Sequence, residues 1–277
     1  GAAAVHGSIL GADGMPAPAS TPLRIIGNLP NEVLAAHPHL EGYIALSATD
    51  TSGTPLLDDD AVTSALTGQV AIAQYVGLPD PTETADIGGA RLDAFTGVQT
   101  AILLDHLYAE AATRAELGVT FHDGRPSFAL WAPTAQAVTL LTWETGDPLG
   151  SVPEVPGPPR RTPAVRTDDG RWVVGNHPGQ PADTDERETS GTAGAPIAAG
   201  CQYLWEVRVY VPSTLQVETN IVTDPYSTAL TTDSTRSVAV DLADPRLSPE
   251  QWAHAPARPV RNDSARSIYE LHLRDFS

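Results

Sequence analysis

Two groups of side chains in this sequence could hold a metal ion. His37 and His39 stand on either side of a proline, but no third ligand lies nearby, and a zinc site needs three or four. Residues 58–60 are three consecutive aspartates without the glycine and distal glutamate of a calcium loop. We therefore expect a turn for the histidines and a solvated charge run for the aspartates, and we predict no metal and no cofactor.

The one cysteine, Cys201, could act as a nucleophile or as a packing residue. A single cysteine excludes an intramolecular disulfide. A catalytic thiol needs an activating neighbour, and none of the eight histidines is placed by the sequence to serve. Because Cys201 begins a strongly apolar segment, we expect a buried or half-buried thiol.

Four tryptophans stand in or beside predicted strands, and an indole ring can either fill a core or stack on a sugar. Trp131, Trp172 and Trp205 lie within apolar segments, which favours core positions. Trp143 differs because it ends a strand next to a loop. It is the one tryptophan that we retain as a binding candidate.

Composition limits the possible partners. The chain has 277 residues, 41% of them hydrophobic, which is enough for one large or two ordinary domains with a real core. Its formal net charge of -18 repels nucleic acid and anionic lipid, so we expect neither as a partner, whereas a neutral ligand such as a sugar is not opposed. All 16 cationic residues are arginines. A GC-rich genome and adaptation to high salt both explain that bias.

The first 117 residues are predicted to form one domain. Residues 1–22 are predicted to be loose, without regular structure. Residues 23–27 are predicted to form a short strand, and residues 30–36 a short helix that Asn28 could cap. Alternating apolar residues predict a strand over 67–75. A helix is expected over 108–117, ended by Gly118.

Residues 118–258 are predicted to form a β-sandwich of immunoglobulin-like type. Strands separated by turn signals recur along this stretch, and the strongest is 202–211, where apolar residues alternate over ten positions. The hairpin at 126–143 precedes it, and residues 217–222 and 238–242 follow as strands. Residues 146–163 read as irregular, and residues 175–200 as a polar loop expected to be mobile.

The last segment, residues 267–276, has the almost continuous apolar pattern of a strand covered on both faces in a parallel sheet. Such a strand needs partners and a crossover helix. We therefore expect residues 259–277 to be a linker and the first strand of a further domain that this chain does not contain. The start of the chain lacks the basic and apolar regions of a signal peptide, and no apolar run is long enough to span a membrane.

Several short motifs together resemble the N-terminal part of pullulanase-type debranching enzymes of glycoside hydrolase family 13. The resemblance rests on the order and spacing of segments 37–43, 96–108, 117–121, 130–135, 217–227 and 268–277. It implies a mainly β chain with two immunoglobulin-like sandwich-type domains, the second similar to carbohydrate-binding module family 48. It also implies that the final segment is strand one of a truncated (β/α)8 barrel.

The resemblance also implies a function for the parent protein: hydrolysis of α-1,6 linkages in pullulan, starch or glycogen, outside the cell. That retaining chemistry needs two carboxyl groups about 5–5.5 Å apart, which the family carries on later barrel strands. Glu270 and Asp275 are read as structural, so no catalytic residue is assigned and this chain alone is predicted to be inactive. The expected partners are an α-glucan and the missing barrel in cis.

Sugar-binding members of this module carry a stacking tryptophan near the position of Trp143, which is the one carbohydrate-binding residue that we predict. Their second tryptophan is matched here by Val217, so packing against the barrel is the alternative role for the module. A stand-alone glucan-binding protein and an adhesion or scaffolding sandwich are the alternative functions.

Overall fold

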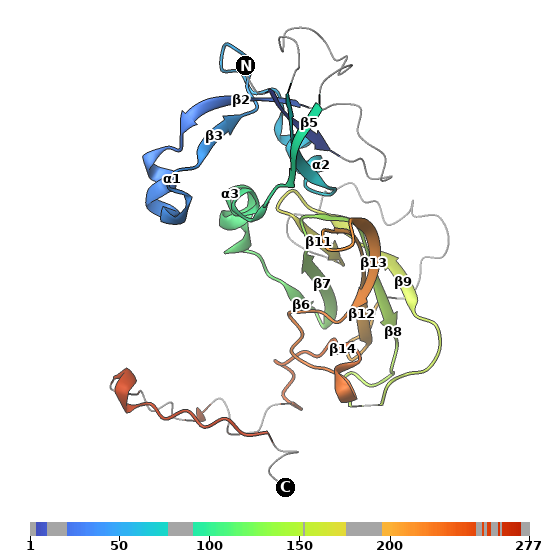
Figure 1. Cartoon of the computed structure of the whole chain (residues 1–277). Helices are drawn as coiled ribbons and strands as arrows, with labels where there is room; N and C mark the ends of the chain where they lie inside the picture. The colour runs from blue at the N-terminus through green and yellow to red at the C-terminus, as the bar shows by residue number, and fades with distance from the viewer. Residues whose placement is uncertain are drawn as a thin grey trace. The chain divides into compact units, whose positions relative to one another are not determined.

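The structure of the protein is a computed structural model, which describes residues 4–9, 21–76, 91–151, 153–175, 196–247, 251, 254–255, 260 and 262–272 (Figure 1). The chain divides into two compact units, Gly1–Asp241 and Leu242–Ser277. The larger unit is mainly β and its strands pair in antiparallel sheets. The prediction of a mainly β chain is confirmed.

The N-terminal part of the larger unit contains a five-stranded sheet in the order β3-β2-β1-β4-β5. Its strands are β1 (Ala4–Ile9), β2 (Thr21–Asn28), β3 (Ile44–Ser47), β4 (Val70–Val76) and β5 (Arg91–Gly97). The helices α1 (Asn31–Ala36) and α2 (Asp59–Ala65) and the 3₁₀ turn η1 (Pro38–Leu40) lie between these strands, and α3 (Ala101–Ala112) follows β5. The described residues thus form one sheet with helices, where the resemblance implied two facing sheets.

Several predicted elements of this part need correction. Residues 4–9, expected to be loose, form β1 because they pair with both β2 and β4. The helix expected over 108–117 is α3, which starts earlier at Ala101 and ends before Thr113. The apolar residues at its start are part of the helix, and Tyr108 is its buried residue. The residue before α1 is Pro30, not Asn28, and makes no side-chain cap.

The second part is a sandwich of two antiparallel sheets (Figure 1). One sheet has the order β10-β11-β7-β6, and the other has the order β13-β12-β8-β9, with β14 also paired to β12. The strands are β6 (Gly118–His122), β7 (Arg125–Trp131), β8 (Ala135–Trp143), β9 (Arg160–Pro163), β10 (Val165–Arg166), β11 (Arg171–Val174), β12 (Gln202–Val211), β13 (Gln216–Val222) and β14 (Ser237–Val238).

The strand β12 has the predicted bounds and is the centre of its sheet, since it pairs with β8, β13 and β14. Two expectations around it were wrong. The stretch 146–163, expected to be irregular, contributes β9, which pairs with β8. The last strand, expected over 238–242, is limited to β14.

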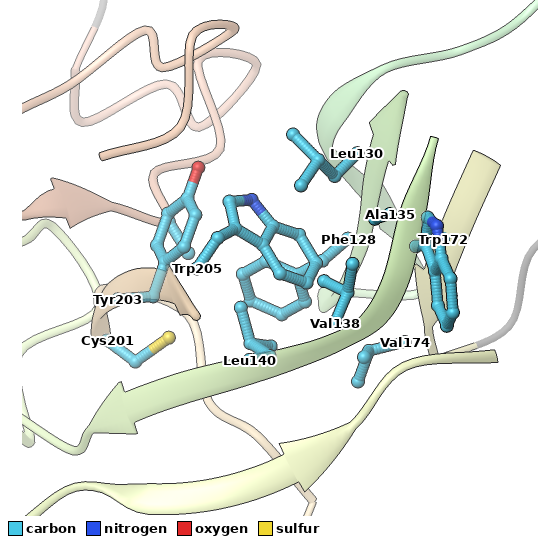
Figure 2. Packing of buried hydrophobic residues seen from close by; sticks show 11 residues of the cluster. Phe128, Leu130, Ala135, Val138, Leu140, Trp172, Val174, Cys201, Tyr203 and Trp205 are labelled. Carbon is cyan, nitrogen blue, oxygen red and sulfur yellow. The ribbon is translucent and has the colours of Figure 1, made fainter. Parts of the chain in front are cut away.

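The hydrophobic core of the sandwich lies between the two sheets (Figure 2). Trp205 and Tyr203 of β12 and Phe128 of β7 are fully buried, and the Phe128 and Tyr203 rings meet edge to face at 5.0 Å between centroids. Alternate residues of β12 thus point inward: Tyr203 and Trp205 lie in the core, and Val207 packs against it.

Gly200 makes the turn into β12. Its φ is +77°, a left-handed conformation that glycine adopts without strain. Its N–H donates to the Ala239 carbonyl at 2.7 Å, and a Cβ at this position would lie 1.8 Å from the Asp147 carbonyl oxygen. Position 200 therefore requires glycine, both because the backbone is left-handed and because a side chain would have no room.

The smaller unit, Leu242–Ser277, carries little regular structure in its described residues. It has a 3₁₀ turn, η4 (Asp263–Ala265), and residues 267–272 form no strand. Ile268 is 94% exposed and Tyr269 is 79% exposed. The expected buried strand is absent from these described residues, since neither face is covered. Residues 273–277 lie outside the described residues. So do residues 176–195, which make up most of the loop predicted to be mobile.

Candidate functional site

Trp143, the predicted sugar-binding residue, is the last residue of β8 and pairs with Gln202, the first residue of β12. Its side chain is largely covered, with 8% relative exposure. Its indole N–H donates to the Gly157 carbonyl at 2.8 Å. The structure therefore places Trp143 at the end of the sandwich, against the 153–157 segment.

A guanidinium group covers one face of the Trp143 ring. The Arg236 Cζ atom lies 3.7 Å from the ring centroid, which is a cation–π contact. Arg236 is held there by hydrogen bonds to the Val155 carbonyl at 2.8 Å and the Gln202 Oε1 at 3.0 Å, and by an ion pair with Glu154 at 2.8 Å. One face of the ring is therefore occupied by Arg236.

The buried amide of Gln202 completes this network. It donates from Nε2 to the Pro153 carbonyl and accepts at Oε1 from the Val155 N–H, both at 2.9 Å. In this arrangement Trp143, Gln202 and Arg236 fasten the 153–157 segment to the end of the sandwich. Sugar contact at Trp143 stays a prediction, and stacking on the face that Arg236 covers requires Arg236 to leave the ring.

The other side chains singled out in the sequence lie mainly in the core. Trp205 and Cys201 are fully buried, and Trp172 is 8% exposed with its indole N–H donated to the Ala132 carbonyl at 2.9 Å. Burial raises the pKa of the Cys201 thiol to about 12, which disfavours the thiolate that a nucleophile needs. The prediction of a buried thiol is confirmed. Trp131 is partly exposed.

Asp224 is a buried carboxylate in the turn after β13. It accepts from the Tyr203 hydroxyl at 2.9 Å and from the Tyr226 N–H at 2.8 Å, and its own N–H donates to Ser237 Oγ at 3.0 Å. Burial, with the Asp224 charge beside it, raises the pKa of the Tyr203 phenol. These contacts join the turn after β13 to β12 and β14, which is a structural role.

The metal-ligand candidates take structural positions. Asp58 caps α2 by accepting from the Ala61 N–H at 2.8 Å, and Asp59 and Asp60 lie in the first turn, where negative charge suits the helix dipole. The rings of His37 and His39 pack edge to face. Over the described ranges, no cluster of three or more metal-ligating side chains occurs. Glu270 is exposed, and Asp275 lies outside the described residues.

A cleft of about 370 Å³, which sequence reasoning missed, lies between α2 and the sandwich. Its polar lining comes from Asp60, Thr63, Ser64, Gln136 and Arg166, with Trp172 in the wall. Gln136 links the two sides, since its Nε2 donates to the Thr67 carbonyl at 3.0 Å. These residues come from distant parts of the chain, so no local motif could have revealed the cleft.

Comparison with known proteins identifies the relatives of this chain. No model of a known protein family matches it. Pullulanase 1, chloroplastic, from Arabidopsis thaliana is 31% identical over 253 residues, covering 91% of this chain and 21% of the relative. A pullulanase from Klebsiella pneumoniae is 30% identical over 250 residues, covering 89% of this chain and 19% of that protein. The chain thus spans about a fifth of the length of these curated relatives.

Solved structures show the same relationship. The Klebsiella pneumoniae pullulanase complexed with maltotriose matches 91% of this chain and 20% of its own, with a TM-score of 0.63 and 25% identity. The apo pullulanase from the same organism also covers 91% of this chain, with a TM-score of 0.63. Within the described residues, no helix is long and apolar enough to cross a membrane. Over nine-tenths of its length, the chain is homologous to the N-terminal region of pullulanases.

Proposed function

We propose that this chain is the non-catalytic N-terminal part of a pullulanase-type α-1,6-glucosidase that acts on pullulan or on the branch points of starch or glycogen. The observation that carries the proposal is the coverage: nine-tenths of this chain aligns with only about a fifth of each relative. The remaining four-fifths of such a protein is where a catalytic barrel would lie, in cis. The sandwich and the N-terminal sheet then serve as its companion domains.

The environment of the acidic residues supports a non-catalytic role. A retaining glycosidase needs two carboxyl groups about 5–5.5 Å apart, facing the substrate. Asp224 is the buried acid of the described residues, and its hydrogen bonds are made within the sandwich. Asp169 is paired with Arg171 at 2.8 Å, and Asp244 with Arg246. These carboxylates neutralise arginines or fix turns.

The domain boundaries and the location belong to the same proposal. We assign residues 1–117 to an N-terminal domain and residues 118–258 to a module similar to carbohydrate-binding module family 48. Residues 259–277 are assigned to a linker and to a segment that would become the first barrel strand once the barrel covers it. We also propose an extracellular location, which suits action on pullulan supplied from outside the cell. Fractionation of the native host would test it, with recovery in the cytosol as the contrary result.

The test of function compares this 277-residue chain with the full-length product of the same gene. The readout is reducing sugar released from pullulan, and dextran (an α-1,6-linked glucan without pullulan's α-1,4 units) is the substrate control. We expect activity in the full-length protein and none in the chain alone, above a heat-treated blank. A full-length product that leaves pullulan intact would contradict the proposal, and activity in the chain alone would contradict its non-catalytic role.

A further inference from the structure

The cleft between α2 and the sandwich holds polar groups whose hydrogen-bonding capacity is largely unused. An arginine side chain has five N–H donors, and Arg166 makes one described hydrogen bond, from Nη2 to the Pro133 carbonyl at 2.9 Å. Among the described residues, the Asp60 carboxylate and the Thr63 hydroxyl have no hydrogen-bond partner. The cleft therefore offers donors, acceptors and a hydroxyl to a ligand.

The geometry of the cleft is fixed from both sides. Gln136 donates to the Thr67 carbonyl after α2 and accepts from the Arg208 guanidinium at 2.6 Å, so its amide is held on the cleft wall. Trp172 has its N–H committed to Ala132, so the surface that it can offer is apolar carbon. A polar rim beside an aromatic wall is therefore in place before any ligand arrives.

The chemistry of this lining selects a neutral, hydroxyl-rich ligand. Asp60 only accepts, Arg166 only donates, and Thr63 and Ser64 can do both, which matches the dual capacity of sugar hydroxyls. The charges of Asp60 and Arg166 balance, and the net charge of -18 opposes an anion. The volume of 370 Å³ falls at the lower end for small-molecule sites, roughly 300–1,000 Å³.

We propose that this cleft, between α2 and the β8, β10 and β11 strands, binds a short segment of a neutral α-glucan chain. The sugar hydroxyls form hydrogen bonds with Asp60, Thr63 and Arg166, and the Trp172 side chain contacts the apolar part of a sugar ring. The choice of an α-glucan among neutral saccharides rests on the proposed function. The site is distinct from Trp143, whose ring face is covered by Arg236.

The experiment is isothermal titration calorimetry of the 277-residue chain with maltotriose, using cellotriose as the stereochemical control. The cleft variants are Arg166→Ala and Thr63→Val, the second nearly isosteric. Asp60→Asn is matched by Asp59→Asn, which removes the same charge on the same helix outside the cleft. Trp143→Phe tests the alternative site. Melting temperatures confirm that each variant is folded.

We expect Arg166→Ala to weaken maltotriose binding about 10-fold or more, and Thr63→Val and Asp60→Asn about 3- to 10-fold, because each removes hydrogen bonds to the ligand. Asp59→Asn should bind as the unchanged chain does. Cleft variants that bind normally, loss of binding in Trp143→Phe alone, or no binding of maltotriose at millimolar concentration would each overturn the inference. None of these results bears on hydrolysis by the full-length protein, which tests the proposed function separately.

Discussion

At the scale of single residues, Arg236 is the side chain with the most consequential contacts. It covers the Trp143 ring and bonds to Glu154, Val155 and Gln202, so it contacts the end of β8, the 153–157 segment and the start of β12. The sequence singled out Trp143 but not this arginine. The reason is that the contact joins the end of β8 to the residue before β14, and a local sequence pattern cannot show a contact between such distant positions.

We predict that Arg236→Ala lowers the free energy of unfolding by about 2–4 kcal/mol, because buried partners lose their donor and the ring loses its cover. Urea denaturation followed by circular dichroism measures this. Arg125→Ala, an exposed substitution in β7, is the control and should change stability by less than about 0.5 kcal/mol. Equal stability in both variants would show that the Arg236 network contributes little.

Cys201 gives a prediction about pH. Its folded pKa of about 12 lies above its ordinary value of 9.0, so the stability linked to this thiol is complete below pH 9 and is lost as the pH rises toward 12. Tyr203, whose pKa is also raised, acts in the same direction above about pH 10. Stability should therefore fall from pH 9 upward, with a shallower slope in Cys201→Ala.

The same thiol supplies an independent check. In the native chain at pH 8 it should not react with a disulfide reagent such as dithionitrobenzoate, and it should react fully in urea. Rapid reaction without denaturant would contradict the burial on which the pH prediction depends, and an unchanged slope in Cys201→Ala would assign the alkaline loss to other groups.

At the scale of elements, the turn at Gly200 decides how β12 enters its sheet. Gly200→Ala should cost more than about 3 kcal/mol, since the new Cβ meets the Asp147 carbonyl and the left-handed φ adds strain. Gly157→Ala is the matched control: its φ is +105° but nothing lies within 4 Å of the new Cβ. It should cost about 1–2 kcal/mol for backbone strain alone.

Chemical denaturation of the two glycine variants separates conformation from space. A large loss in both would mean that left-handed φ dominates at either turn. Near-normal stability of Gly200→Ala would show that the Asp147 segment can move away, and that the close approach seen here is not a constraint.

Elements whose apolar residues recur with a regular period could be predicted from the sequence. Elements that form only because a neighbouring strand offers backbone hydrogen bonds could not. The strand β12 has ten alternating residues, and its predicted bounds match those observed. The edge strand β9 (Arg160–Pro163) has no such pattern and exists because β8 offers it backbone partners. The helix α2 (Asp59–Ala65) was missed because its aspartates read as a charge run, although Asp58 is a normal helix cap.

The candidate site shows the same limit. Trp143 was found because an aromatic residue at a strand end stands out in a sequence. The α2 cleft joins residues 60–67, 135–136, 166 and 172, and it becomes visible only after the sheets are assembled.

At the scale of the whole molecule, the division after Asp241 predicts which residues can be removed. Side chains such as Ile268 and Tyr269 bury little, so deleting residues 242–277 should shift the melting temperature by less than about 2 °C. Thermal unfolding by calorimetry measures the shift. Light scattering on the same samples should show less aggregation, because exposed apolar residues are removed.

A shorter chain that ends at Thr235 is the control for this deletion. It loses Arg236 and β14 and should melt at a clearly lower temperature. A fall of more than about 5 °C on removing 242–277 alone would show that the smaller unit stabilises the larger one.

The central position of β12 also has a consequence for the order of folding. Its pairing with β13 closes through a short turn, whereas its pairing with β8 joins Trp143 to Gln202 and requires all of 144–201 to close as a loop. Loop closure costs entropy before the long-range contact forms, and topologies rich in such contacts fold slowly. The β12–β13 hairpin should therefore form early, and pairing of β12 with β8 should form later. Changes of length within 144–201 should then alter the folding rate more than the free energy of unfolding.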